Sequence, residues 1–417
     1  MTAIIDYRGK SPNKTTFGVP LITAKVVKGG RIETPDEFIA EVDYEEWMSR
    51  GIPQAGDVVM TTEAPLGEVA QLDGRKVALA QRIITLRGKP GLLDQSFLKF
   101  LLQSKSVQEE LRSRATGTTV VGIKQSELRK VNLTLPPYES QKCIGHILGT
   151  LDDKIELNRR MNETLEAMAR AIFQSWFVDF DPVRAKASGE STDSICQRLG
   201  LTPELLALFP DSFEDSELGA IPEGWNPKVF SETIQIIGGG TPKTSVEDFW
   251  GGDIPWFSVV DAPTDSDVFV IDTEKKITNK GLESSSTKLL PAGVTIISAR
   301  GTVGKVALVG TPMAMNQSCY GLRGRNSCDV YTYYATRQLV SSLKRHGHGA
   351  VFDTITRDTF ASVKVVSCDA ISKAFDAMVA PNMKRIKANA FHTARLVELR
   401  DSLLPKLLTG ELSPMER

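Results

Sequence analysis

The sequence predicts an α+β protein in which two similar mixed α/β domains are joined by two long antiparallel coiled-coil helices, with pseudo-two-fold symmetry. Three observations lead to this fold class. The two halves of the 417-residue chain repeat each other at a spacing of roughly 231 to 237 residues. Short runs bounded by glycine and aspartate indicate strands and hairpins inside each repeat. After each repeat, apolar residues recur at intervals of four and three, which is typical of a coiled coil.

The repeat is clearest in two pairs of segments. Residues 56–70 align with 293–307, and residues 78–88 align with 314–324, where Ala, Gln, Leu, Arg and Gly stand in the same places. Because each copy is followed by a helical pattern, the chain divides into five parts. These are a first module (1–137), a central long helix (138–178), an acidic linker (179–220), a second module (221–368) and a C-terminal long helix (369–412).

Each module reads as short strands followed by a helix. In the first module, a predicted strand at 52–59 leads through a polar turn to 67–72, and Asp73-Gly74 marks a hairpin. Residues 95–114 then carry apolar side chains at helical spacing. The same order recurs in the second module, so both modules are expected to contain a largely antiparallel sheet.

The long helices carry a continuous seam, and about 35 helical residues make a rod of about 50 Å. A seam of this length is too long to be covered by one small domain. We therefore expect the two helices to pair antiparallel, with the modules at opposite ends; packing of each helix on its own module alone is the alternative. Asn158 should face polar positions and fix the register. The predicted seam residues are Ile144, Leu148, Leu151, Ile155, Asn158, Leu165, Ile172, Phe375, Val379, Ile386, Asn389, Leu396 and Leu403.

The stretch between the first helix and the second module reads as a linker with short helical pieces, such as 203–208. At about 40 residues it is long enough to return the chain along the rod. It holds 3 Lys/Arg against 9 Asp/Glu, whereas the first module holds 19 against 16 and the second 15 against 14. The net charge of −1 therefore hides modules that are mildly basic, which permits nucleic-acid binding on one face.

Composition excludes several classes of protein. No run of 18 apolar residues is present, so we expect a cytoplasmic protein that does not enter a membrane. The five cysteines are scattered without a CxxC pair, which argues against a disulfide framework and against zinc. We expect no metal site.

Three catalytic interpretations fail on their own chemistry, so no catalytic residue is assigned. Leu135-Pro136-Pro137-Tyr138 resembles an amino-methyltransferase motif, but Leu135 cannot accept a hydrogen bond from the target amine. The glycine run at 238–240 lacks the Lys-Ser/Thr ending of a phosphate loop. Asp272 with 274–276 only loosely matches a nuclease metal site.

Basic, hydroxyl and amide side chains gather instead in loops at matching places of the two modules. Glycines let a backbone approach phosphates, Arg and Lys neutralise phosphates or read guanine, and Gln can pair with adenine. Solvated loops are the alternative, as are buried amides that brace the sheet in the case of the two glutamines. The candidate DNA-binding residues are Lys10, Lys14, Thr61, Gln81, Arg82, Arg112, Arg114, Thr118, Lys124, Thr241, Lys243, Thr244, Arg300, Gln317, Lys344, Arg345, His346 and His348.

Four segments together resemble the DNA-specificity subunit of type I restriction-modification systems. They are Ile-Pro-Glu-Gly-Trp at 221–225, the Gly-Gly-Thr-Pro and Trp-Gly-Gly-Asp-Ile-Pro-Trp runs within 239–256, the entry to the first helix at 133–141, and the end of the second helix at 403–412. The resemblance covers essentially the whole chain.

This resemblance implies a non-catalytic reader of an asymmetric two-part DNA site, with one target recognition domain for each half and the helix pair setting the spacer. It implies double-stranded DNA, two methylation subunits and the restriction, or motor-nuclease, subunits as partners. S-adenosylmethionine is expected on the methylation subunits and no cofactor in this chain. The alternatives are a scaffold with duplicated binding modules, and a free-standing nuclease or methyltransferase.

Overall fold

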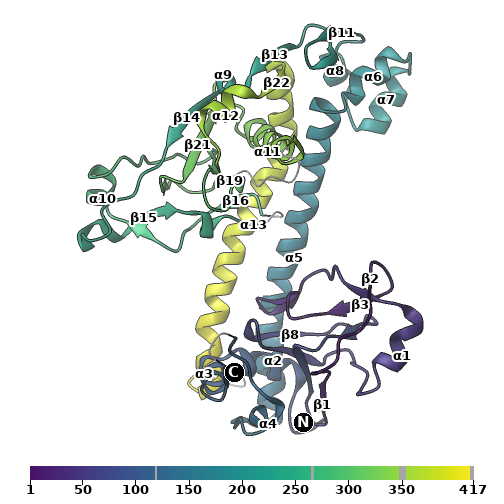
Figure 1. Cartoon of the computed structure of the whole chain (residues 1–417), viewed down its shortest axis with the longest axis vertical. Helices are drawn as coiled ribbons and strands as arrows, with labels where there is room; N and C mark the ends of the chain where they lie inside the picture. Colours follow the sequence, from purple (N-terminus) through teal and green to yellow (C-terminus); the bar gives the residue numbers. More distant parts are fainter. Residues whose placement is uncertain (118–119, 264–266, 347–353, 414–417) are drawn as a thin grey trace. The chain divides into compact units, whose positions relative to one another are not determined.

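The protein consists of two compact units (Figure 1). The first unit comprises Met1–Glu156 with Arg395–Arg417, and the second comprises Leu157–Ala394. Each unit therefore contains one module and a part of each long helix. The computed structural model describes residues 1–117, 120–263, 267–346 and 354–413.

The first module combines two four-stranded sheets and the two-stranded β4-β5 sheet with short helices. Its elements are β1 (Ala3–Asp6), β2 (Lys14–Thr15), β3 (Val19–Ile22), β4 (Val27–Lys28), β5 (Arg31–Ile32), β6 (Phe38–Ile39), α1 (Tyr44–Trp47), β7 (Val58–Thr62), β8 (Leu66–Gln71), β9 (Ala78–Leu79), β10 (Ile83–Arg87), α2 (Gln95–Gln103), α3 (Lys105–Ser113) and α4 (Gln125–Leu128). Strands β1, β10, β7 and β8 form an antiparallel sheet in that order.

The central strand β7 is buried on both faces, and its alternating side chains enter two different cores. Met60 joins the core beneath α2, whereas Val59 joins the core shared with the smaller sheet β2-β6-β3-β9. Two predictions are wrong in this module: the start of the strand at 52–59 and the single helix at 95–114. The strand predicted at 52–59 begins only at Val58, because residues 54–57 make a turn in which Gly56 has φ +86° and the Asp57 amide donates to the Gln54 carbonyl at 3.1 Å.

The single helix predicted at 95–114 is also divided. Ser104 has an extended backbone (ψ 147°), which ends α2, and its hydroxyl accepts a hydrogen bond from the Val107 amide, which caps α3. A serine at this position is a local signal for a helix start, but the apolar spacing on both sides of it predicted one continuous helix.

The second unit repeats this plan with larger insertions. Strand β11 (Phe213–Ser216) and the start of β12 (Gly219–Pro222) fall within the stretch predicted as a linker. The elements that follow are β13 (Asn226–Val229), α9 (Phe230–Thr233), β14 (Ile234–Gly238), β15 (Trp250–Phe257), β16 (Phe269–Val270), β17 (Lys276–Ile277), α10 (Asn279–Glu283), β18 (Thr295–Ser298), β19 (Val306–Val309), β20 (Ala314–Met315), β21 (Cys319–Gly324), α11 (Asp329–His346), α12 (Arg357–Ser362) and β22 (Lys364–Ser367).

Strand pairing shows that the sequence repeat is a structural repeat. The order β14-β21-β18-β19 of the second module matches β1-β10-β7-β8 of the first, and all these pairs are antiparallel. The smaller sheets match as well, since β3 runs parallel to β9 and β15 runs parallel to β20. One strand pair differs: β13 pairs with β22 in the second module, whereas residues 131–135 form no strand in the described part of the first.

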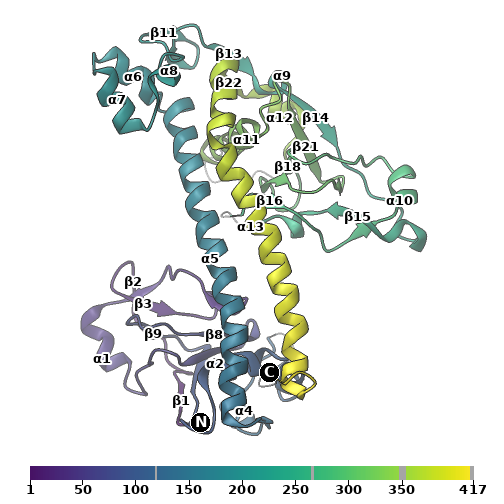
Figure 2. The ribbon, with the colours of Figure 1, turned by 180° about the vertical axis from the view of Figure 1, so that it is seen from behind.

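The long helices are α5 (Tyr138–Phe177) and α13 (Asp369–Thr409). In the second unit, the C-terminal half of α5 lies beside the N-terminal half of α13 (Figure 2). There Asn389 donates to Asn162 at 2.8 Å. In the first unit, Arg400 pairs with Asp152 at 2.9 Å. In the second unit, Asn158 also donates to Thr393 at 3.2 Å, so residue numbers fall on α5 as they rise on α13 and the two segments are antiparallel. Each helix also packs on its own module, so both interpretations apply.

The predicted seam positions are the inward-facing ones. The buried members are Ile144, Leu148, Asn158, Phe375, Val379, Ile386 and Asn389. The half-buried members are Leu151, Ile155, Leu165, Ile172, Leu396 and Leu403.

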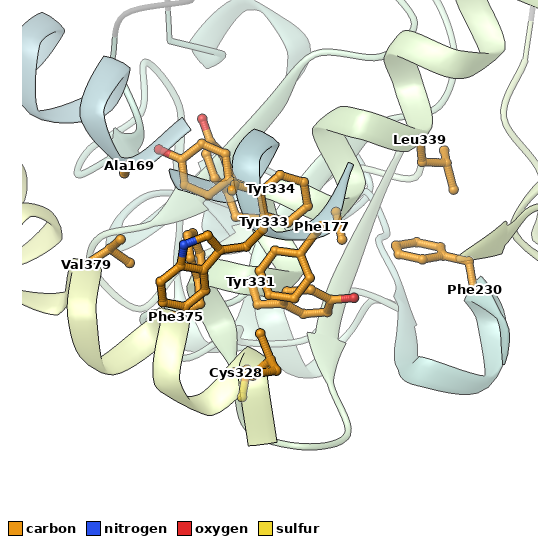
Figure 3. Close-up of a cluster of buried hydrophobic side chains, with 14 of the residues drawn as sticks. Ala169, Phe177, Phe230, Cys328, Tyr331, Tyr333, Tyr334, Leu339, Phe375 and Val379 are labelled. Atoms are coloured by element: carbon orange, nitrogen blue, oxygen red, sulfur yellow. The ribbon is translucent and has the colours of Figure 1, made fainter. Parts of the chain in front are cut away.

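An aromatic cluster joins α5, α13 and the second module (Figure 3). Phe177 lies 4.9 Å from Tyr331 and 5.6 Å from Phe375 between ring centroids. Trp225, from the Ile-Pro-Glu-Gly-Trp segment, lies 6.0 Å from Phe177. Such contacts add about 0.5–1.5 kcal/mol per pair beyond the burial of apolar area, so this cluster fixes the module on its helices.

The linker does not return the chain along the helix, and that expectation is wrong. It folds into α6 (Asp181–Ala187), α7 (Thr192–Leu199) and α8 (Pro203–Leu206) beside the end of α5. Val183, Ile195 and Phe209 are buried in the same core as Trp176. The apolar residues between its acidic ones explain the difference, because they need a core to cover them.

Candidate nucleic-acid interface

Three loops distant in sequence meet in the first module. The Thr62 amide donates to the Arg82 carbonyl, and the Ile123 amide donates to the Thr62 carbonyl, both at 3.0 Å. Glu63 forms an antiparallel bridge with Gly122. We call residues 62–66, 81–82, 112–117 and 120–124 the first loop surface.

The second module repeats this junction bond for bond. The Ala299 amide donates to the Ser318 carbonyl at 2.7 Å, and the Ile355 amide donates to the Ala299 carbonyl at 2.9 Å. Arg300 forms a bridge with Thr354, as Glu63 does with Gly122. We call residues 239–244, 299–304, 316–318 and 354–356 the second loop surface.

Glycines make these close approaches possible. A Cβ on Gly239 would lie 1.9 Å from the Asn316 carbonyl oxygen, a distance that no side chain tolerates. Gly240 donates its amide to Met315 at 3.0 Å. The glycine run is therefore held against the strand end that precedes Gln317, and no α-helix opens directly after it as a phosphate loop requires.

On the first loop surface, Arg112 and Lys124 are exposed, while Gln81 is half-buried. Arg82 pairs with Glu63 at 3.1 Å, and Arg114 pairs with Glu110 at 3.0 Å.

Arg8 brings the exposed Lys10 loop to the first loop surface, because its Nη2 donates to the Ile123 carbonyl at 2.6 Å. The sequence analysis did not predict this role of Arg8. The available signal was the position of Arg8 two residues before Lys10. Lys14 lies on β2 and pairs with Glu37 at 2.8 Å.

Thr61 is a wrong prediction. It is fully buried in β7, where its hydroxyl accepts a hydrogen bond from the Glu68 amide at 2.9 Å. Its hydroxyl braces the β7–β8 hairpin and is not available to DNA. A threonine in a strand pattern has high β-propensity, and that was the signal against a role in a loop.

On the second loop surface, the Thr241 hydroxyl donates to the Gln317 Oε1, so two predicted residues from distant segments meet. Gln317 is exposed, which excludes a buried bracing amide at this position. Lys243, Thr244 and Arg300 are also exposed.

Lys344 and Arg345 are exposed on the last turn of α11. His346 ends that helix, and its side chain lies outside the described part of the structure. Thr118 and His348 also lie outside the described residues.

The chemistry considered for the alternatives has little structural support. Asp272 forms an exposed ion pair with Lys276 at 3.1 Å. Within the described ranges, no group of three or more His, Cys, Asp or Glu is arranged to hold a metal ion. None of the helices in the described part of the chain has the length and apolarity needed to cross a membrane.

Two copies of one module, each presenting cations and amides on a junction of loops, define a protein that recognises a ligand in two parts. The chain matches the family described as type I restriction modification DNA specificity domain over residues 8–167 and 222–366. It belongs to this family: it is a DNA-specificity subunit of a type I restriction-modification system, which recognises DNA and is not itself catalytic.

Individual relatives are named as specificity subunits of the same kind of system. The HindI specificity subunit of Haemophilus influenzae is 29% identical over 374 residues, covering 80% of this chain and 81% of the relative. The MjaIX specificity subunit of Methanocaldococcus jannaschii is 24% identical over 411 residues, covering 94% and 87%. The crystal structure of the S subunit from M. genitalium has the same fold, with a TM-score of 0.53 at 15% identity over 97% of this chain and 98% of that one.

Proposed function

We propose that each loop surface reads one half of an asymmetric DNA site and that the helix pair sets the spacer between the halves. The observation that carries this proposal is the identical backbone junction in both modules, combined with different side chains at equivalent positions. Glu63 is replaced by Arg300, and Arg82 by Ser318. One scaffold with two sets of reading groups suits a site whose halves differ in sequence.

The charge distribution supports DNA as the ligand. Arg112, Lys124, Lys243 and Arg300 are exposed on the loop surfaces, where they can neutralise phosphates. Neither module has a large excess of cations, so affinity should depend on basic partner subunits as well. We propose that two methylation subunits bind this chain, supply that charge and carry S-adenosylmethionine, and that restriction subunits join this complex.

The test is selection from a random DNA pool by the full chain in complex with its methylation subunits. We expect a split motif with two fixed halves. Replacing residues 1–137 by the first module of a relative should change one half only, and the matched replacement of 221–368 should change the other half only. Recovery of no split motif, or a change of both halves by one replacement, would contradict the proposal.

A further inference from the structure

An ion pair lies at the centre of the first loop surface. Arg82 Nε lies 3.1 Å from Glu63 Oε1. The side chains are 54% and 38% exposed, so the pair faces solvent and not the core. Exposed ion pairs of this kind contribute only about 0–1 kcal/mol to stability. Stability alone therefore gives little reason for a carboxylate and a guanidinium to be held together here.

The backbone fixes both partners. The Thr62 amide bonds to the Arg82 carbonyl, and Glu63 is bridged to Gly122 on the third segment of the junction. Space around the bridge is tight, since a Cβ on Gly122 would lie 3.0 Å from Glu63 Cβ. Arg82 is thus carried on a rigid platform, and a site built on such backbone is more exact than one on a free loop.

The geometry of the pair leaves the reading groups of arginine available. Glu63 engages the Nε side of the guanidinium, and no hydrogen bond from the two Nη groups of Arg82 is found within the described residues. These groups carry four of the five N–H donors of arginine. A guanidinium fork that donates two parallel bonds matches the O6 and N7 acceptors of guanine in the major groove.

The two equivalent positions of the second module cannot form such a pair. Arg300 occupies the position equivalent to Glu63, and Ser318 occupies the position equivalent to Arg82. A carboxylate-held arginine at this point of the junction is therefore a property of the first module.

We propose that Arg82, positioned by Glu63, reads a guanine in the half-site bound by the first module. This inference rests on the proposed function, because it requires the first loop surface to face DNA. Arg82 is the specificity-determining residue, and Glu63 is a positioning residue that limits the orientations of the guanidinium.

The experiment is selection from a random DNA pool by the full chain with its methylation subunits, comparing wild type with Arg82→Ala, Arg82→Lys and Glu63→Gln. We expect Arg82→Ala to lose roughly ten-fold to hundred-fold discrimination for guanine at one position of one half-site. Arg82→Lys should not restore it, since lysine lacks the planar fork. Glu63→Gln should weaken the same preference by a smaller factor, with the other half-site unchanged.

Arg75→Ala is the matched control. Arg75 forms a comparable exposed ion pair with Asp73, at 2.8 Å, on the β8–β9 turn of the same module. The control should leave every base preference unchanged. If Arg82 contacts only phosphate, Arg82→Ala will weaken binding to all sequences equally and reduce the dependence on salt, and the inference is overturned.

Failure of this inference differs from failure of the proposed function. A wild-type complex that selects no split motif contradicts the function itself. A wild-type complex that selects a split motif, together with an Arg82→Ala variant of unchanged base preference, contradicts only the role of Arg82. Urea unfolding of each variant shows whether a lost preference reflects a lost fold.

Discussion

The two modules contain equivalent helices, α2 and α11, each of which begins against a long helix. The carboxylate that caps the short helix comes from a different element in each module. In the first module, α2 supplies its own cap: Asp94 accepts a hydrogen bond from the Phe97 amide at 2.9 Å. The long helix α5 leaves room for it with Gly145, where a Cβ would lie 3.1 Å from the Asp94 carboxylate.

In the second module, the residue before α11 is Cys328, whose thiol is a weak hydrogen-bonding group. Here the long helix α13 supplies the cap. Asp376 accepts from the amides of Val330 and Tyr331, at 3.1 and 2.7 Å. Asp376 also occupies the place on α13 that Gly145 occupies on α5, counted from the start of each helix.

This difference shows that the repeat preserves a contact and not the residues that make it. The capping carboxylate belongs to the residue before the short helix in the first module and to the long helix α13 in the second. The position of Gly145 on α5 is taken on α13 by the capping Asp376 itself. An acid at the start of a helix is stabilising from either origin, because it satisfies free amides and opposes the positive end of the helix dipole.

A second difference concerns acids on α5. In the first unit, Asp152 is shared between Lys99 at 2.5 Å and Arg400 at 2.9 Å, and its side chain is 15% exposed. In the second unit, the side chain of Glu166 is 4% exposed and pairs with Arg337 at 2.6 Å. The deeper burial of Glu166 makes the second unit the more sensitive one.

The largest predicted effect tests that contrast. Glu166→Ala should destabilise the second unit by about 3–5 kcal/mol, since it removes a buried carboxylate and leaves the half-buried Arg337 guanidinium without its carboxylate partner. Asp152→Ala should cost the first unit less, because the Asp152 side chain is 15% exposed against 4% for Glu166 and because Arg400 keeps its ion pair with Asp401. Urea unfolding followed by tryptophan fluorescence reports mainly on the second unit, which holds Trp176, Trp225, Trp250 and Trp256.

Glu163→Ala is the control on the same helix. Glu163 pairs with Arg159 one turn away and is 40% exposed, so its loss should change stability by less than about 0.5 kcal/mol. Equal effects of the Glu166 and Glu163 substitutions would contradict the role of burial.

The second prediction concerns pH and the cap on α11. Burial raises the pKa of Asp376 to about 6, from 3.8, with the nearby Asp329 adding to the rise and the amides of Tyr331 and Val330 opposing it. Because the folded pKa is the higher one, folding favours the protonated form. The stabilisation is therefore complete below about pH 4 and is lost as pH rises through about 6.

Asp376→Asn should remove this dependence, although it keeps only one of the two acceptor oxygens, since the Val330 amide donates to Oδ2 and the Tyr331 amide donates to Oδ1. Relative to wild type, the variant should therefore gain up to about 3 kcal/mol of stability between pH 4 and pH 7, on top of a pH-independent loss from the missing hydrogen bond, as measured by urea unfolding of the second unit. Asp94→Asn is the matched cap variant in the first module. A difference between Asp376→Asn and wild type that stays constant from pH 4 to 7 would contradict this assignment.

Some of these features could be predicted from the sequence because they are local. The seam positions follow from spacing along one helix, and residues such as Phe375 and Leu148 are buried as that spacing requires. The repeat itself is a comparison of segments and needs no structure. The burial of Thr61 could also have been found, since Val58, Val59 and Met60 before it form one strand.

Other features depend on pairing between distant residues and could not be predicted. Glu63 meets Gly122, and Thr241 meets Gln317, only because separate strands align their ends. The alignment of 56–70 with 293–307 places Glu63 opposite Arg300, but it cannot show that Arg82 lies against Glu63. The cap that Asp376 supplies could not be predicted either, because its partners lie on α11 and nothing in α13 itself requires an acid at this position.

The smallest predicted effect concerns the polar seam, which distinguishes the second unit. Asn158 donates from its Nδ2 toward Thr393 at 3.2 Å, but its buried Oδ1 has no hydrogen-bond partner within the described residues. A buried acceptor without a partner is costly, so Asn158→Leu should raise the free energy of unfolding by about 1 kcal/mol. The same change should loosen the register, because a polar pair across the seam penalises slippage.

Cysteine cross-linking measures that register. Leu165 and Ile386 each lie three residues from the Asn162–Asn389 contact, in the directions that keep them opposite each other. Cysteines at 165 and 386 should cross-link efficiently in the wild-type background, whereas cysteines at 165 and 379, one heptad out of register, should not. In the Asn158→Leu background the second pair should begin to cross-link. A more stable variant whose cross-links stay confined to the first pair would show that Asn162 and Asn389 alone set the register.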